Sequence, residues 1–223
     1  MKSKHKDQVV TPLHQAAAAG DLDEVKKLLA KGAFPDCLNH HNQSPLYSAL
    51  LLPICHDAEL KSRKEAIFKL LYEKKPSMIT KQDNSGDTPF HLMAVYGFDD
   101  LFSELLTKHQ HMAYMPNNHT QYLIHTAILN QRRDIMACLL KLDNVWTQTD
   151  SNDEAALHYA ARRGTRDMVK LCCEVSKDVN VLNRDNRTPW QLAFEEGNTD
   201  AMLELEIHGA EKSELNSMVR SLR

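Results

Sequence analysis

Residues 88–94, TPFHLMA, decide the fold because their pattern returns along the chain. The pattern is a threonine or serine, then proline, then an apolar residue, and two of the copies fit only once these first positions are relaxed. Its copies begin at Thr11, Ser44, Thr88, Tyr122, Ala155 and Thr188. The steps between these starts are 33, 44, 34, 33 and 33 residues. A nearly constant step of this size is the sequence signature of a repeat protein.

Each copy has the chemistry of a helix start followed by a helix pair. Threonine or serine caps a first helix, and proline follows at a position where its missing N–H is harmless. Glycine recurs at one offset, at Gly20, Gly97, Gly164 and Gly197, where a turn between helices favours a left-handed residue. A leucine-rich stripe such as Leu28-Leu29 then predicts a second helix. One such unit cannot bury both of its faces, so stability must come from stacked neighbours.

These motifs resemble those of the ankyrin-repeat family. The resemblance is carried by TPLHQAA (11–17), TPFHLMA (88–94), ALHYAA (156–161) and DVNVLNRDNRTPWQLA (178–193), and it covers about residues 8–210. It implies an all-α solenoid of six stacked helix-turn-helix units with β-turn fingers. We therefore expect a single ankyrin-repeat domain over residues 1–223. Its first and last repeats are predicted to be caps, and residues 211–223 a trailing helix or frayed tail.

The 44-residue step places an insertion in the second repeat. Aligning Leu70-Leu71 with Leu28-Leu29 leaves nine extra residues between the two helices of this repeat, at about 53–62. Pro53 is predicted to end the first helix, and the second helix is expected over roughly Leu60–Glu73. Such an insertion can enlarge a binding surface, or its apolar residues can simply pack onto the helices. The sequence leaves both alternatives open.

Composition narrows the functional class. The net charge of −3 gives no bias toward nucleic acid. The five cysteines are odd in number and show no framework spacing, which favours reduced thiols in the cytoplasm. No apolar run approaches the ~20 residues of a membrane span, and the N-terminal residues lack the apolar core of a signal peptide. A cytoplasmic monomer is expected.

Histidine and cysteine are the residues that could carry chemistry. Four histidines, His14, His91, His125 and His158, occupy the fourth motif position, and the resemblance implies that they hydrogen-bond backbone groups. The chain has no CxxC or HExxH motif, so neither a metal nor another cofactor is expected.

Two pairs of a cysteine and a histidine are candidates for a catalytic nucleophile and its base. Cys37 with His40 and Cys55 with His56 are close in sequence. Adjacent residues on a helix point about 100° apart, so neighbours in sequence need not form a working pair. Phosphate-loop and nucleophile-elbow motifs are also missing from the sequence. The prediction is a protein that is not an enzyme.

The resemblance implies a partner-binding groove on the concave face, formed by finger tips and the late part of each first helix. The repeat register then predicts the contact residues, which are Leu51, Leu52, Val95, Tyr96, Leu129, Asn130, Arg162 and Arg163 on the helices and His40, His41, His119 and Arg184 on the fingers. Trp146 is a further anchor candidate that could instead pack between fingers. Apolar groups in repeats two to four and arginines in repeats five and six predict a protein or peptide with an apolar segment followed by acidic residues.

The predicted function is binding of a protein partner without catalysis. Its most specific version is a secreted effector of an intracellular bacterium acting on a host protein in the host cytosol, and a cytosolic adaptor or inhibitor is the first alternative. The chain resembles such effectors in its Lys, Asn, Gln and His content and in its C-terminal glutamates, Glu204, Glu206, Glu211 and Glu214. An ankyrin part of a larger enzyme, or a Cys/His-dependent enzyme, is the remaining alternative, because fold alone cannot choose among functions.

Overall fold

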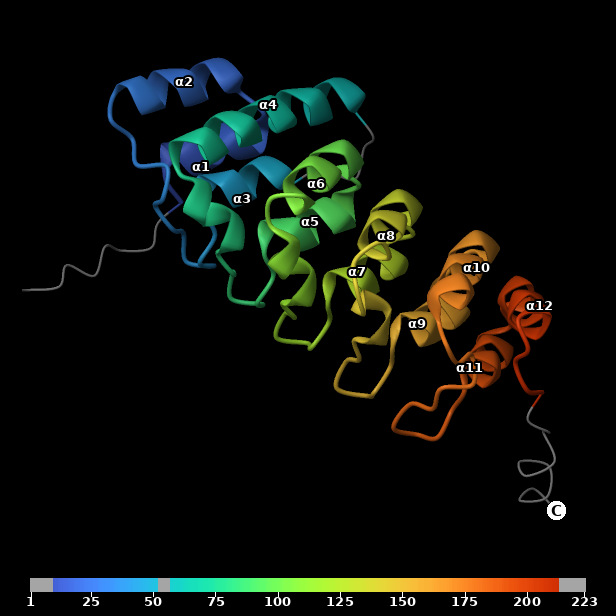
Figure 1. The fold of residues 1–223 in the computed structure, drawn as a ribbon. Coiled ribbons are helices and arrows are strands. Elements are labelled where there is room, and N and C mark those ends of the chain that lie inside the picture. Colours follow the sequence, from blue (N-terminus) through green and yellow to red (C-terminus); the bar gives the residue numbers. More distant parts are fainter. Residues whose placement is uncertain (1–9, 52–56, 213–223) are drawn as a thin grey trace, which may run out of the picture. The chain divides into compact units, whose positions relative to one another are not determined.

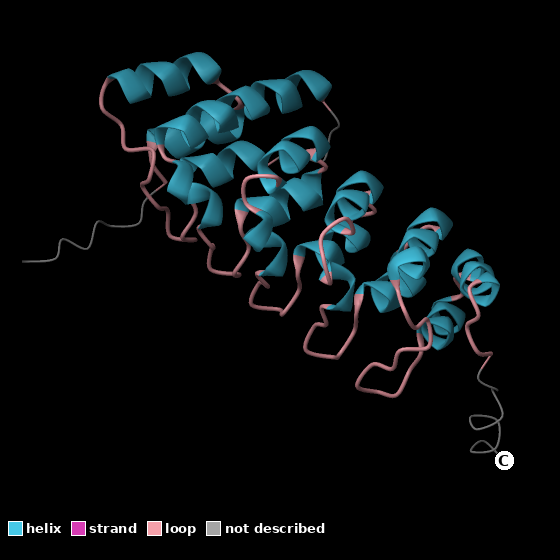
Figure 2. Ribbon diagram, in the orientation of Figure 1, coloured by secondary structure: helices cyan, strands magenta, loops and turns pink. Residues whose placement is uncertain are grey.

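The computed structural model describes residues 10–51 and 57–212. The chain divides into two compact units, Met1–His119 (unit 1) and Thr120–Arg223 (unit 2) (Figure 1). The described residues form helices joined by loops, without strands (Figure 2). The predicted all-α class is confirmed. No helix in the described ranges is both long and apolar enough to cross a membrane.

Unit 1 contains three helix pairs. They are α1 (Pro12–Ala19) with α2 (Leu22–Ala30), α3 (Pro45–Leu50) with α4 (Ala58–Lys74), and α5 (Pro89–Tyr96) with α6 (Asp99–Leu106), and the 3-10 helices η1 (Pro76–Thr80) and η2 (Gln110–Tyr114) follow the last two pairs. The first helices pack in a row, α1 against α3 and α3 against α5. Phe90 and Phe102 are fully buried, with ring centroids 5.3 Å apart and nearly perpendicular rings. Aromatic contacts of this kind add to the stabilisation from burial.

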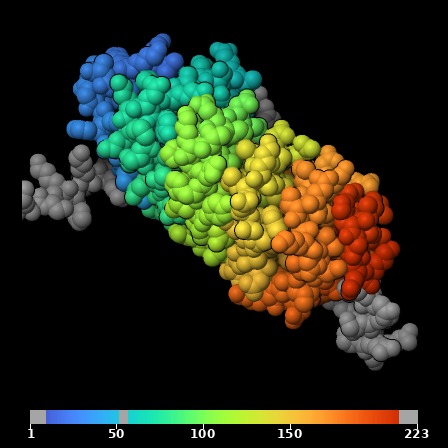
Figure 3. Space-filling view, in the orientation of Figure 1, coloured from blue at the N-terminus to red at the C-terminus, as the bar shows by residue number. Residues whose placement is uncertain are grey.

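Unit 2 repeats this arrangement. Its pairs are α7 (Leu123–Leu129) with α8 (Arg133–Leu139), α9 (Ala156–Arg163) with α10 (Arg166–Val175), and α11 (Pro189–Glu196) with α12 (Thr199–Ile207), and η3 (Val145–Thr147) follows the first pair. Helix α9 packs between α7 and α11, and α10 packs between α8 and α12. Within each unit the helix pairs form successive bands of colour packed side by side (Figure 3).

The first helix of every pair begins at the second residue of a copy of the sequence pattern. The residues that precede these helices are Thr11, Ser44, Thr88, Tyr122, Ala155 and Thr188. Their extended backbone and the proline that follows four of them are typical of a helix start. Ser44 Oγ accepts a hydrogen bond from Tyr47 N at 3.3 Å, which caps α3.

Glycine supplies the left-handed turn in three of the four predicted places. Gly20, Gly97 and Gly197 have φ of 75°, 72° and 70°. The same prediction is wrong for Gly164, whose φ is −76°. A Cβ there would lie 2.6 Å from Ala160 O, so this position needs glycine for space rather than for a left-handed backbone.

The described part of the insertion is helical. Helix α4 starts at Ala58, two residues before the predicted start, because Asp57 Oδ1 accepts from Leu60 N at 3.1 Å and caps it. Residues 52–56, which include Leu52, Pro53, Cys55 and His56, lie outside the described residues. Leu60 packs so closely on the turn after α1 that a Cβ at Gly20 would lie 2.6 Å from its Cδ1.

Two lysines of α4 contact the ends of neighbouring helices. Lys61 Nζ donates to Gly97 O at 2.6 Å and lies 5.4 Å from the centre of the Phe98 ring. Lys64 is fully buried, and its Nζ donates to Leu51 O at the end of α3. The added helical turns therefore pack across the turns of the neighbouring helix pairs in unit 1.

Replacing Lys64 by methionine is expected to remove a pH dependence of stability. Burial lowers the pKa of Lys64 from 10.5 to about 8. Between those pH values the unfolded chain binds a proton that the folded chain has released, so the free energy of unfolding rises with pH in this window. Urea unfolding of Lys64→Met, followed by circular dichroism, should lack that rise. The exposed Lys69→Met on the same helix is the control, and equal slopes for both variants would contradict the prediction.

Candidate partner-binding surface

The fingers between helix pairs share one local hydrogen-bond motif. Each opens with an asparagine or aspartate whose side-chain oxygen accepts hydrogen bonds from later backbone N–H groups. Asn39 Oδ1 accepts from His41 N at 2.9 Å and from Gln43 N at 3.0 Å. Asp150 Oδ1 accepts in the same way from Asn152 N at 2.8 Å and Glu154 N at 3.0 Å. These bonds hold the finger backbone in its turn without help from a partner.

Two tyrosines fix fingers to the first helices. Tyr47 OH donates to Asp83 Oδ2 at 2.7 Å, and Tyr159 OH donates to Asp150 Oδ2 at 2.9 Å. Burial, and then the neighbouring carboxylate, raise the pKa of the Tyr47 hydroxyl. Burial likewise raises the pKa of Tyr159. Both tyrosines therefore stay neutral donors in physiological conditions.

In unit 1 the finger tips are joined in a row. Asn84 N donates to His41 O at 3.0 Å, and Asn118 N donates to Ser85 O at 3.0 Å. Asn84 Nδ2 adds a bond to His40 O at 3.0 Å. Gly86 allows this close approach, because a Cβ there would lie 2.5 Å from Asn118 N. The row gives unit 1 an ordered polar edge.

The predicted contact residues of unit 1 lie at accessible positions. His40, His41 and His119 are exposed on the fingers, and Leu51, Val95 and Tyr96 are half-buried at the ends of α3 and α5. We call these six residues together with Asn84 and Ser85 the unit 1 face. Leu52, predicted with them, lies outside the described residues.

The corresponding residues of unit 2 also reach the surface. Leu129 is 42% exposed, Asn130 and Arg162 are half-buried, and Arg163 and Arg184 are exposed. Arg184 N donates to Asn152 O at 2.9 Å, which joins the two fingers of this unit. We call these five residues together with Ser151 and Asn152 the unit 2 face. Trp146 lies away from this set, on η3, where it lines a pocket together with the start of α9.

The arginines of the unit 2 face are paired with carboxylates. Arg162 binds Glu154 through two nitrogens, at 2.7 and 3.2 Å, and Glu154 is only 4% exposed. Arg163 lies 4.0 Å from Glu196, and Arg184 lies 3.6 Å from Asp153. Carboxylates therefore lie beside the arginines that the sequence analysis assigned to this face.

The motif histidines have the structural role that the resemblance implied. His14 Nδ1 accepts from Thr11 N at 3.2 Å, and His14 Nε2 lies 2.9 Å from Gln43 O. His125 makes the matching contacts, with Tyr122 N at 3.2 Å and with Gln148 O at 3.2 Å. Burial lowers the pKa of His14 and lowers that of His125 to about 4. Their imidazoles are thus neutral and hydrogen-bonded to backbone groups.

Three of the described thiols lie beside a motif histidine or in the core. Cys37 Sγ lies 3.9 Å from His14 Nδ1, so the imidazole beside it is the backbone-bound His14 and not the predicted His40. Burial raises the pKa of Cys173 to about 12 and also raises that of Cys172. Cys55 and His56 lie outside the described residues. Among the described residues, no group of three or more His, Cys, Asp and Glu side chains could hold a metal ion.

Comparison with known proteins places the chain in a family. A family profile described as ankyrin repeats in three copies matches residues 124–216, and a profile for ankyrin repeats in many copies matches residues 13–51. The chain belongs to the ankyrin-repeat family. The ankyrin repeat domain of human ASB11 has the same fold, with a TM-score of 0.73, 22% identity and coverage of 92% of this chain and 86% of that one.

Curated relatives of this ankyrin-repeat chain differ widely in length. A transient receptor potential cation channel subfamily A member 1 homolog from Caenorhabditis elegans is 26% identical over 68% of the chain, which spans only 13% of the channel protein. The probable 26S proteasome regulatory subunit p28 of Saccharomyces cerevisiae is 25% identical over 90% of the chain and 86% of its own length. Ankyrin repeats are typically protein-interaction modules, and these relatives specify no partner for this chain.

Proposed function

We propose that this ankyrin-repeat chain binds a protein or peptide through the unit 1 and unit 2 faces and catalyses no reaction. The observation that carries the proposal is the hydrogen-bonded construction of the fingers. Asn84, Asn118 and Arg184 join neighbouring tips through backbone bonds of 2.9 to 3.0 Å. A surface that is ordered before binding loses less conformational entropy when a partner docks, which favours affinity.

The two faces favour different chemistry in the partner. On the unit 1 face, half-buried Val95 and Tyr96 lie at the end of α5 and offer apolar contact. On the unit 2 face, Arg162 and Arg163 stand beside Glu154 and Glu196, so charges of both signs are present. We infer a partner with an apolar segment and a mixed-charge segment, in place of the purely acidic segment that the arginines alone suggested.

An adaptor or inhibitor role is preferred to that of a secreted effector. The effector alternative drew on the C-terminal glutamates. Glu204 pairs with Arg166 at 2.8 Å and is 5% exposed, and Glu206 accepts from Trp190 Nε1 at 3.1 Å. Structural contacts therefore explain two of the four glutamates. The cysteines of the described residues are free thiols, which supports a reducing compartment such as the cytoplasm. We propose that the chain acts there as a monomer.

The double variant Tyr96→Ala/Arg163→Glu is expected to lose most partner binding. Tyrosine and arginine are the residue types that most often dominate binding energy, and loss of about 1.4 kcal/mol already lowers affinity tenfold. Affinity purification with the wild-type chain, quantified by mass spectrometry, would identify proteins whose recovery falls at least tenfold with the variant.

A matched control makes this experiment specific. Lys170→Glu introduces the same change of charge as Arg163→Glu at an exposed position on the second helix α10, outside both faces. It should leave partner recovery unchanged. If a folded double variant recovers the same proteins in the same amounts as the wild type, the assignment of the faces is wrong.

A further inference from the structure

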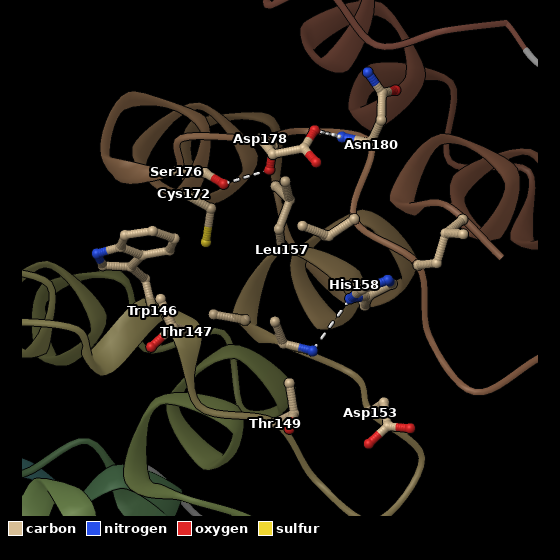
Figure 4. Close-up of a pocket in the computed structure, with 14 residues that line it drawn as sticks. Trp146, Thr147, Thr149, Asp153, Leu157, His158, Cys172, Ser176, Asp178 and Asn180 are labelled. Carbon is tan, nitrogen blue, oxygen red and sulfur yellow. Dashed lines mark hydrogen bonds between the residues drawn. The ribbon is translucent and has the colours of Figure 1, made fainter. Parts of the chain in front are cut away.

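Unit 2 contains a pocket that the two faces do not use. It has a volume of about 630 Å³ and lies between η3, the start of α9, the end of α10 and the connector after α10 (Figure 4). Leu157 and Cys172 are buried in its wall, and Trp146 is half-buried beside them. The faces use the finger tips and the C-terminal ends of the first helices, whereas this pocket uses the N-terminal end of α9.

The pocket has a local structural cause. Connectors that follow α4, α6 and α8 each contain a 3-10 helix, but the described residues between α10 and α11 contain none. Here Asp178 Oδ1 accepts from Asn180 N at 2.7 Å, and Asp178 O accepts from Ser176 Oγ at 2.6 Å. These bonds direct the backbone into an open path toward Leu182, which is 56% exposed at the pocket rim. This open path leaves the space beside the start of α9 as a pocket.

The inner wall of the pocket is apolar and uncharged. Figure 4 shows the Cys172 sulfur directed toward the space beside the Trp146 ring, and Leu157 also lines this space. Burial keeps the Cys172 thiol protonated by raising its pKa, and burial lowers the pKa of His158, which keeps its imidazole neutral. Pockets of roughly 300–1,000 Å³ with such walls bind small organic molecules. A flat aromatic group fits best beside an indole ring.

The rim carries negative charge. The residues that line the pocket include two exposed aspartates, Asp153 and Asp178, and no lysine or arginine. Asp153 forms a salt bridge with Arg184, with 3.6 Å between Oδ2 and Nε. Within the described ranges, no cationic side chain lies within salt-bridge distance of Asp178, whose carboxylate accepts a hydrogen bond only from Asn180 N. An anionic ligand would meet repulsion here, and a cationic one would gain a partner.

We propose that this pocket binds a small organic cation with an aromatic body. The aromatic body lies against Trp146 and Leu157, and the cationic group lies at the rim beside Asp178. A cation close to an indole face gains further attraction from the ring. Partner binding by the two faces does not require this site, so a failed test here leaves the proposed function standing.

Fluorescence of Trp146 provides the test. Trp190→Phe removes the other tryptophan of the chain, so the remaining emission reports on the pocket. The probes are 4-biphenylmethylammonium and 4-biphenylacetate, which share their rings and differ in the sign of their charge. We expect saturable changes in Trp146 emission with both probes, and about fivefold tighter binding of the ammonium.

Three further variants in the same background define the site. Thr149→Phe, at an exposed position that lines the pocket, should abolish binding of both probes by filling the mouth. Asp178→Asn should bring the two affinities within about twofold of each other, because it keeps the acceptor and removes the charge. Asp185→Asn, on an exposed finger tip outside the pocket, should preserve the fivefold preference.

Other outcomes would overturn the proposal. Absence of a saturable signal with either probe would show that the pocket does not take an aromatic body. Equal affinity for ammonium and acetate in the parent protein would remove the cationic class. Should Thr149→Phe fail to fold, backbone amide shifts of the parent protein on probe addition replace it, and shifts that avoid residues 146–149 and 172–182 would place the probe elsewhere.

Discussion

Lowering the pH from 6.5 to 4 is expected to remove about 3 kcal/mol of the free energy of unfolding of unit 2 through His125 alone. His125 is fully buried in α7, with its ring stacked on Tyr159 at a centroid distance of 4.5 Å. Burial is the main cause that lowers its pKa from 6.5 to about 4, against the opposing effects of Asp150 and the Gln148 carbonyl. Charging this imidazole inside the fold is therefore unfavourable.

The direction follows from the two pKa values. Well above pH 6.5 His125 is neutral in both states, and its contribution to stability is complete. As the pH falls toward 4, the unfolded chain binds a proton that the folded chain does not bind, so the free energy of unfolding decreases. Burial lowers the pKa of His158 as well, which adds to the loss in the same direction.

Glutamine offers a natural replacement for His125. In the last helix pair Gln191 holds the same motif position, and its Oε1 accepts from Thr188 N at 2.9 Å. His125→Gln should therefore fold and should lose less stability than the wild type on acidification. Both tryptophans lie in unit 2, so urea unfolding followed by tryptophan fluorescence at pH 7 and pH 4.5 reports on this unit. An equal loss in His125→Gln and in the control His40→Gln would contradict the assignment.

Replacing Glu154 by alanine is expected to destabilise unit 2 by about 2–3 kcal/mol. The Glu154 carboxylate accepts from Arg162 Nη2 at 2.7 Å and from Asn183 Nδ2 at 3.1 Å, so it ties one finger to α9 and to the next finger. Breaking a fully buried pair costs about 3–5 kcal/mol, and a smaller loss is expected here because the Arg162 side chain remains 33% exposed.

The control for Glu154→Ala is an exposed acid of the same unit. Glu195 pairs with Arg187 at 2.8 Å, with side-chain exposures of 40% and 30%. Glu195→Ala should cost at most about 1 kcal/mol, as exposed ion pairs do. Tryptophan fluorescence in urea measures both variants. A similar small loss in the two would mean that Glu154 does not hold the fingers together.

Much of the fold could be predicted from the sequence because the repeat pattern is local. Thr88, Pro89 and His91 encode a helix start within four residues, and each performs that role in the structure. The finger geometry could also be predicted from the sequence, since Asn39 and Asp150 occupy the same position in their repeats. Short side chains of this kind cap turns.

The side-chain contacts of the two faces were harder to predict because they depend on packing between segments that are not adjacent in sequence. Arg162 and Glu154 are eight residues apart, and the carboxylate meets the guanidinium only because the finger folds against α9. Trp146 was placed in the predicted finger region, but its environment depends on how the connector after α10 departs from a 3-10 helix. The number of repeats, their grouping into one domain and the binding role of both faces remain predictions.

Hydrogen exchange of the chain with and without a captured partner tests the proposed binding surface most directly. We predict slower exchange on binding in the finger residues 39–43, 83–87, 150–154 and 183–187 and at the C-terminal ends of α3, α5, α7 and α9. Amides of the second helices, such as α2 and α10, should exchange at unchanged rates. Protection confined to the second helices, with the fingers unaffected, would contradict binding through these faces.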